Sequence, residues 1–236
     1  MGVKADARLL EAMQARATAT AGDFNPQNVA NLVLALATMG VTADARLLEA
    51  MQARATATAG DFNPQNVANL VWALATMGIT ADARLLEAMQ GRATATAGDF
   101  DPQGVANLFW ALACFDASPS QVSVLLVESM AVRLLSLREQ LSVGGKSRMH
   151  QWLLFCDLHP EWRGQLPRSM QTVKEELGGD FRQAFALEDP TISRLQGEEQ
   201  LRRYLQDKLR IDQVPPSSRS VPDGEGRDQA GTAREP

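Results

Sequence analysis

Residues 43–80 read ADARLLEAMQARATATAGDFNPQNVANLVWALATMGIT, and this 38-residue unit occurs three times in the chain. The copies occupy residues 5–42, 43–80 and 81–118. The first two copies are identical at 36 of 38 positions and the last two at 29, which indicates recent duplication. A fixed period of this length is typical of repeat proteins, whose units bury their apolar surfaces by stacking on one another.

Each unit is predicted to form a helical hairpin. In unit one, the first helix covers residues 5–16, with Asp6 in the first turn, where the helix dipole favours an acid. The second helix begins with Asn25 as its N-cap and Pro26 as its first helical residue. Gly40 is expected to cap the end of this second helix.

The two helices of a unit differ in how much of their surface is apolar. The first helix has one apolar stripe, made of Leu9, Leu10, Met13 and Ala17, which leaves its opposite side free. The second helix is apolar nearly all round, with Val29, Leu32, Val33, Leu34, Leu36 and Met39. Such a helix has to be covered on several sides, and stacked hairpins cover it. The sequence therefore predicts an all-α fold, an α-solenoid in which each first helix keeps an exposed, repeating face.

The beginning of the chain falls in the middle of the repeat pattern. Residues 1–3 (Met-Gly-Val) match residues 39–41 at the end of a unit, and unit one has no polar cap. We therefore expect that upstream repeats are missing from this chain, and that the uncapped apolar side of unit one self-associates.

After residue 118 the period stops, but helical patterns continue. We expect a helical region over residues 119–211 and a disordered tail over 212–236, where Pro, Ser, Gly, Asp and Arg dominate. The predicted domains are thus 1–118, 119–211 and 212–236. The expected helices of the second region are 118–141, 146–158, 169–177, 181–187 and 192–211, with Gly144-Gly145 and Gly178-Gly179 as helix ends.

Composition excludes some classes of protein. The chain of 236 residues has a net charge of −5, which gives no reason to expect a polyanion partner. Its two cysteines exclude a disulfide-stapled secreted scaffold. No apolar run approaches the length of a membrane span, so no membrane association is predicted, and no transit peptide is visible at the N-terminus.

The sequence contains no recognisable catalytic group, so we expect no enzyme activity, no cofactor and no metal. Cys156 and His159 have the spacing of metal ligands, with His150 six residues before the cysteine, but a zinc site needs four ligands. The favoured interpretation is a buried thiol and two surface imidazoles. Residues 144–147 (Gly-Gly-Lys-Ser) end like a phosphate loop, but its upstream glycine is missing, so a turn with an N-capping serine is favoured.

Part of each unit resembles a known repeat. Residues 62–78 (FNPQNVANLVWALATMG) resemble the second helix of the octotricopeptide repeat, a 38-residue unit of organellar RNA-binding proteins of green algae. Residues 149–158 (MHQWLLFCDL) and 166–167 are similar to the helical region before a RAP domain in these proteins, and residues 190–196 to its last stretch. The RAP core is not found after residue 200, and residues 42–46 replace the proline-rich start of the family's repeats.

The resemblance implies a function in an organelle. It implies that the chain binds single-stranded RNA in the chloroplast, or otherwise in the mitochondrion. There the protein would support the stability, processing or translation of a transcript.

The candidate RNA-binding residues lie on the free side of each first helix. They are Arg8, Glu11, Arg46, Glu49, Arg84 and Glu87. Stacked hairpins would set the arginines in a row about 10 Å apart, where they suit phosphates or bases. The glutamates suit base amino groups. The alternative is that each arginine pairs with the glutamate three residues later.

The charge of the repeats and the position of their tryptophans both bear on RNA binding. Up to residue 118 the chain holds 7 Lys/Arg and 11 Asp/Glu, which counts against phosphate binding. Trp72 and Trp110 suggest base stacking, but Leu34 at the same position of unit one favours a core role. The alternative function is a helical-repeat scaffold that binds other proteins and no RNA.

Overall fold

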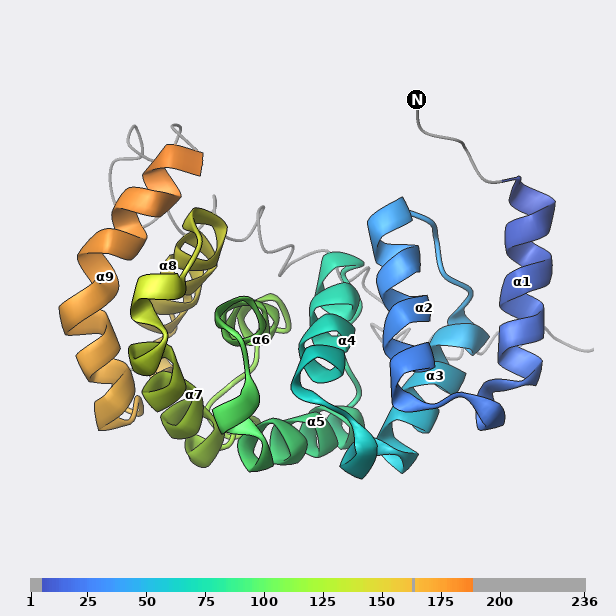
Figure 1. The fold of residues 1–236 in the computed structure, drawn as a ribbon, viewed down its shortest axis with the longest axis horizontal. Coiled ribbons are helices and arrows are strands. Elements are labelled where there is room, and N and C mark those ends of the chain that lie inside the picture. The colour runs from blue at the N-terminus through green and yellow to red at the C-terminus, as the bar shows by residue number, and fades with distance from the viewer. Residues whose placement is uncertain (1–5, 163, 189–236) are drawn as a thin grey trace, which may run out of the picture.

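Paired helices follow one another along an arc in the computed structural model, which describes residues 6–162 and 164–188 (Figure 1). One helix of each pair lies in an outer layer of the arc and the other in an inner layer. Each outer helix contacts the next outer helix, and each inner helix contacts the next inner helix. The described residues contain no strand, so the predicted all-α solenoid is confirmed.

The outer layer consists of α1 (Ala7–Ala19), α3 (Ala45–Ala57), α5 (Ala83–Ala95), α7 (Val124–Ser136) and α9 (Arg168–Glu188). The inner layer consists of α2 (Pro26–Met39), α4 (Pro64–Thr76), α6 (Pro102–Cys114) and α8 (Val143–Leu158). Short 3-10 turns join α1, α3, α5 and α7 to the inner helices that follow them: η1 (Ala21–Asp23), η2 (Ala59–Asp61), η3 (Ala97–Asp99) and η4 (Arg138–Gln140). The turn η5 (Pro160–Trp162) lies between α8 and α9.

Local capping explains where the helices of a unit begin and end. Asp6 is the N-cap of α1 rather than a residue of its first turn, because its carboxylate accepts hydrogen bonds from the backbone N–H groups of Arg8 and Leu9. As predicted, Asn25 caps α2, with Pro26 as the first helical residue. Gly40 ends α2 with a left-handed φ of 61°, a conformation that costs glycine little.

Two side-chain hydrogen bonds are repeated from one hairpin to the next. In the first, an arginine of an outer helix donates from Nε to the carbonyl oxygen just before the preceding inner helix. The pairs are Arg54 to Phe24 at 2.6 Å, Arg92 to Phe62 at 2.5 Å and Arg133 to Phe100 at 2.8 Å. In the second, a glutamine oxygen accepts from the N-cap N–H of the following outer helix. The pairs are Gln14 with Asp44, Gln52 with Asp82 and Gln90 with Ser123.

The hairpin pattern continues beyond residue 118, where the sequence repeat stops. Arg133 and Ser123 of α7 make the same two contacts to the preceding hairpin as their counterparts in α3 and α5. The spacing between the arginine and its carbonyl partner is 30 residues in the first two pairs and 33 in the third. The loop before α7 is therefore three residues longer, and α7 with α8 forms a fourth hairpin with a diverged sequence.

Several helix bounds after residue 118 differ from those predicted. The helix expected from Ser118 begins only at Val124, because residues 118–122 form the longer loop. Gly144 and Gly145 lie in the first turn of α8, whose N-cap is Ser142. α9 runs unbroken through Gly178 and Gly179, because its packing against α7 and α8 outweighs the low helix propensity of glycine. The helix predicted over 192–211 and the tail over 212–236 lie outside the described residues.

Candidate nucleic-acid interface

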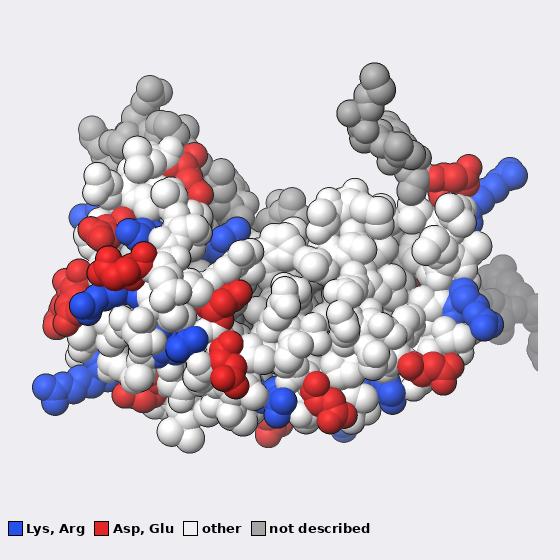
Figure 2. Space-filling model, viewed as in Figure 1, with Lys and Arg blue, Asp and Glu red and all other residues white. Residues whose placement is uncertain are grey.

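The six candidate RNA-binding residues all lie on the outside of the arc. All six side chains are exposed, and the predicted repeating face of the outer helices is therefore present. On α3 this face consists of Arg46, Glu49 and Ala53, and we call it and its counterparts on α1 and α5 the outer face. Positive and negative side chains follow one another along the outer edge of the arc in Figure 2.

The arginines of the outer face do not pair with their glutamates. Within residues 6–162 and 164–188, every ion pair joins two residues of the segment 116–180. None of these pairs involves Arg8, Arg46 or Arg84. The alternative in which each arginine is bound by the glutamate three residues later is thus not formed. The guanidinium groups are accessible to a ligand.

Grooves between neighbouring outer helices bring side chains of different units together. The groove between α1 and α3 has a volume of about 330 Å³ and is lined by Glu11, Gln14, Ala15, Thr18, Asp44 and Arg46. Glu11 therefore shares a groove with Arg46 of the following hairpin instead of with Arg8. Sequence spacing alone did not indicate this pairing, because it depends on how the hairpins stack.

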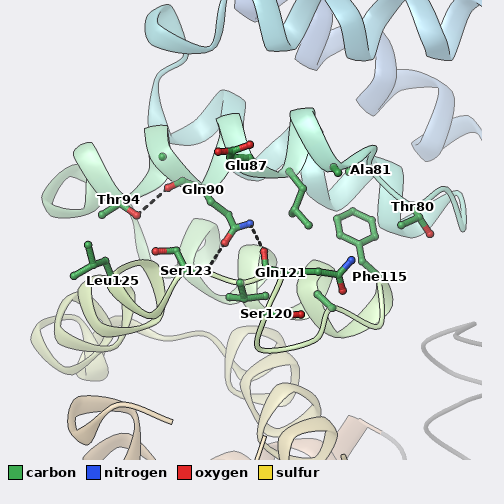
Figure 3. A pocket seen from close by; sticks show the side chains of 15 residues that line it. Thr80, Ala81, Glu87, Gln90, Thr94, Phe115, Ser120, Gln121, Ser123 and Leu125 are labelled. Carbon is green, nitrogen blue, oxygen red and sulfur yellow. Dashed lines mark hydrogen bonds between the residues drawn. The ribbon is translucent and has the colours of Figure 1, made fainter. Parts of the chain in front are cut away.

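A second groove lies between α5 and α7 and is larger, at about 710 Å³ (Figure 3). Its α5 side holds Glu87, Gln90, Gly91 and Thr94, the counterparts of the α1 residues in the first groove. Its α7 side holds Ser123 and Leu125 in place of Asp44 and Arg46. The Gln90 amide bridges the carbonyl of Gln121 and the N–H of Ser123, at 2.8 and 2.7 Å. Gln90 therefore links the two sides of this groove, whose lining residues include no arginine.

The inner layer differs chemically from the outer face. Helices α2, α4 and α6 contain no charged residue, and Figure 2 shows uncharged atoms over this part of the molecule. Gln27 and Asn31 are exposed on the side of α2 opposite its buried Val29 and Val33. This uncharged, amide-bearing surface was not predicted, although the absence of charge from the second helix of each 38-residue unit is visible in the sequence.

Trp72 and Trp110 are partly buried and pack against the core from this inner layer. The indole N–H of Trp110 donates to Gln151 Oε1 of α8 at 3.1 Å. The favoured core role of these tryptophans agrees with their packing, although neither ring is fully buried.

The candidate metal ligands do not converge. Among the described residues, no group of three His, Cys, Asp or Glu side chains could hold a metal ion. Cys156 is buried, as predicted, and burial raises the pKa of its thiol. His150 is also buried, so its prediction as a surface imidazole is wrong. Its ring lies 5.1 Å from that of Phe185, because α9 covers α8.

His150 is expected to make stability depend on pH. Burial, followed by the nearby Arg182, lowers the pKa of His150 to about 4, while Asp157 acts in the opposite direction. In the unfolded chain His150 takes up a proton near pH 6.5, whereas in the folded protein it does so only near pH 4. The free energy of unfolding is therefore highest above pH 6.5 and falls as the pH drops towards 4. We expect a loss of about 3 kcal/mol over this window. Urea midpoints at several pH values should show a shallower decline for His150→Leu, and equal slopes would contradict the assignment.

Comparison with known proteins places the chain in a family. Residues 1–143 match the RNA-editing substrate-binding complex 6 protein. The chain belongs to this family. The match to the RNA-editing substrate-binding complex 6 family agrees with the expectation of an RNA-associated helical protein. Comparison with curated proteins finds no match.

The part of the chain that matches the RNA-editing substrate-binding complex 6 family contains the whole outer face. It covers the first three hairpins and α7, and it ends at the first residue of α8. His150 and Cys156 lie beyond it. No helix in the described ranges is both long enough and apolar enough to cross a membrane.

Proposed function

We propose that this protein binds single-stranded RNA through the outer face of its repeats and has no catalytic activity of its own. The observation that carries the proposal is the same exposed arginine and glutamate on three successive outer helices, with the arginines free of ion pairs. Membership of a family named for an RNA-editing substrate-binding complex supports RNA as the ligand.

The arrangement suggests separate roles for the two side chains. Arg8, Arg46 and Arg84 contact phosphates, because α2, α4 and α6 of the inner layer offer no cation. Glu11, Glu49 and Glu87 accept hydrogen bonds from base amino groups, and Glu11 and Glu87 line grooves of about 330 and 710 Å³. Repeat proteins that bind one base per repeat select that base with two or three side chains of each repeat.

The setting proposed for this activity is an RNA-processing assembly in an organelle. The 38-residue period and the Phe-x-Pro-Gln turn support an octotricopeptide type of repeat, and the RNA-editing family supports processing of a transcript. Effects on the stability or translation of that transcript would follow from occupying the RNA.

The proposal is tested by titrating labelled single-stranded RNA with the full chain at two salt concentrations. Three phosphate contacts predict a slope of log affinity against log salt of about −2, and so a loss of roughly 15-fold between about 50 and about 200 mM salt. A double-stranded RNA of the same sequence is the control and should bind more weakly. Absence of RNA binding at both salt concentrations would contradict the proposal.

A protein-binding scaffold is the second candidate function. The observation that favours it is an exposed apolar patch on α7, formed by Val124, Leu125 and Val132, whose exposed fractions are 58, 68 and 54%. Leu125 and Val132 occupy the α7 positions that correspond to Arg46 and Ala53 of the outer face. The outer surface thus changes from charged to apolar at the fourth hairpin, which suits a protein partner.

A further inference from the structure

The groove between α5 and α7 is larger than the groove between α1 and α3. Its volume of about 710 Å³ is about twice the 330 Å³ of the α1–α3 groove. Gly91 lines the α5–α7 groove where Ala15 lines the α1–α3 groove. A Cβ atom added to Gly91 would meet no other atom within 4 Å. The α5–α7 groove therefore has open space beside Gly91, where the α1–α3 groove holds a methyl group.

The two grooves also differ in charge. Glu87 is the one charged residue among the described residues that line the α5–α7 groove. Its counterpart Glu11 shares the α1–α3 groove with Arg46, whereas Leu125 occupies the position of that arginine on α7. Leu125 is 68% exposed and lies across the groove from Glu87 (Figure 3). The α5–α7 groove thus disfavours a phosphate and favours an uncharged group that donates hydrogen bonds.

Gln90 sets the spacing between the two sides of this groove. Its side chain is 5% exposed. Its Nε2 donates to the carbonyl oxygen of Gln121 at 2.8 Å, and its Oε1 accepts from the N–H of Ser123 at 2.7 Å. Both ends of the amide therefore serve to link α5 to the segment that begins α7, and Glu87 remains as the charged acceptor on the α5 side.

Guanine is the base whose hydrogen-bonding edge best suits one carboxylate. Its ring N–H and its exocyclic amino group lie side by side, so the two oxygens of a carboxylate accept from both. Adenine and cytosine place an amino group beside a ring nitrogen that is itself an acceptor, and uracil has one ring N–H between two carbonyl oxygens. A carboxylate therefore gains two charge-assisted hydrogen bonds from guanine and at most one from each of the other bases.

We propose that the α5–α7 groove binds a guanine base of the RNA. The carboxylate of Glu87 accepts from the ring N–H and the amino group, and the side chain of Leu125 covers one face of the ring. Arg84, three residues earlier on the same side of α5, contacts a phosphate of the same strand. The inference rests on the proposed function in taking RNA as the ligand. It adds that the fourth hairpin selects one base by chemistry that the α1–α3 groove does not share.

The probes for this site are guanosine monophosphate and inosine monophosphate, which differ only in the exocyclic amino group. Binding to the full chain is followed by NMR through the methyl signals of Leu125, which are assigned by their absence from Leu125→Arg. We expect the guanine nucleotide to bind about tenfold more tightly, through one additional charge-assisted hydrogen bond. Equal affinity for the two nucleotides would overturn the proposal.

Variants locate the site within the full chain. Glu87→Gln should reduce the preference for guanine over inosine to less than about twofold, because an amide replaces one acceptor oxygen by a donor. Leu125→Arg should also reduce it without weakening the inosine nucleotide, because a guanidinium then shares the groove with Glu87. The matched control Glu11→Gln makes the same change in the α1–α3 groove and should alter both affinities by less than about twofold. Equal loss of preference in the control would overturn the proposal.

Oligonucleotides separate this proposal from the proposed function. A strand of adenines with one central guanine should bind the full chain about tenfold more tightly than the same strand with inosine in its place. Equal binding of the two strands would overturn the guanine site and leave RNA binding intact. If neither strand binds but the guanine nucleotide binds through Glu87, the proposed function is wrong and the guanine site is supported.

An arginine side chain of a partner protein is the competing occupant, because it also donates two hydrogen bonds to one carboxylate. Its probe is a glycine–arginine–glycine peptide with blocked ends, titrated in the same NMR experiment. We expect this peptide to bind more weakly than the guanine nucleotide. Tighter binding of the peptide that Glu87→Gln abolishes would overturn the proposal, because the groove would then take a protein side chain.

Discussion

Replacing Trp152 by alanine is expected to lower the free energy of unfolding by about 4 kcal/mol, the largest effect of any single substitution considered in this protein. Trp152 lies on α8 and is 0% exposed. Its ring centroid lies 5.2 Å from that of Phe109 on α6, 5.7 Å from Phe155 on α8 and 5.2 Å from Trp162 in η5. Removing the ring leaves a cavity where three segments meet, so chemical denaturation should show a much lower midpoint.

Trp152→Phe is the matched control for this substitution. The indole N–H of Trp152 has no hydrogen-bond partner among the described residues, so phenylalanine loses volume but no hydrogen bond. We expect the phenylalanine variant to cost less than about 2 kcal/mol. If alanine and phenylalanine are equally well tolerated, Trp152 does not organise the junction of α6, α8 and η5.

The Arg8→Ala/Arg46→Ala/Arg84→Ala triple variant is expected to bind single-stranded RNA roughly 20-fold more weakly than the original chain at low salt. Each arginine in the row neutralises one phosphate, so the salt dependence of binding should nearly vanish together with the affinity. All three side chains are exposed and outside the described ion pairs, so the Tm should change little. Filter binding at two salt concentrations measures both quantities.

A variant with the same change of charge separates the row from the overall charge. Arg138→Ala/Arg168→Ala/Arg182→Ala also removes three exposed arginines, but from η4 and α9 rather than from the outer face. We expect this variant to weaken RNA binding less than threefold, through long-range electrostatics alone. Comparable losses in the two triple variants would show that the outer face is not the RNA-binding surface.

The hairpins themselves could be predicted from the sequence because their determinants are local. Asn25 and Pro26 begin α2, and Gly40 ends it, through hydrogen bonds and backbone angles within a few residues. The apolar positions of the second helices require cover on several sides, which predicted stacking and an exposed outer face. The candidate arginines and glutamates were placed on that face by helical periodicity alone.

Tertiary structure decided the features that depend on contacts between distant residues. The fourth hairpin keeps the Arg133–Phe100 contact although its sequence no longer resembles units one to three. The contact is kept because α7 packs against α5 and α6 as the outer helices of the earlier hairpins pack against their neighbours. Packing of α9 against α7 and α8 also keeps α9 helical at Gly178 and Gly179. The same packing buries His150 of α8 beneath α9.

In the candidate site, too, some features follow from the local sequence and others from the stacking of the hairpins. The sequence by itself determined that each first helix carries an exposed arginine and glutamate, because their angular positions on a helix are set by its 3.6-residue period. Only the stacking of hairpins decided that Glu11 shares a groove with Arg46. The stacking also decided that Arg54 donates a hydrogen bond to the carbonyl of Phe24, while Arg16, with the same local sequence, is exposed. Identical units thus differ in chemistry because a side chain's environment depends on its neighbouring hairpin as well as on its own helix.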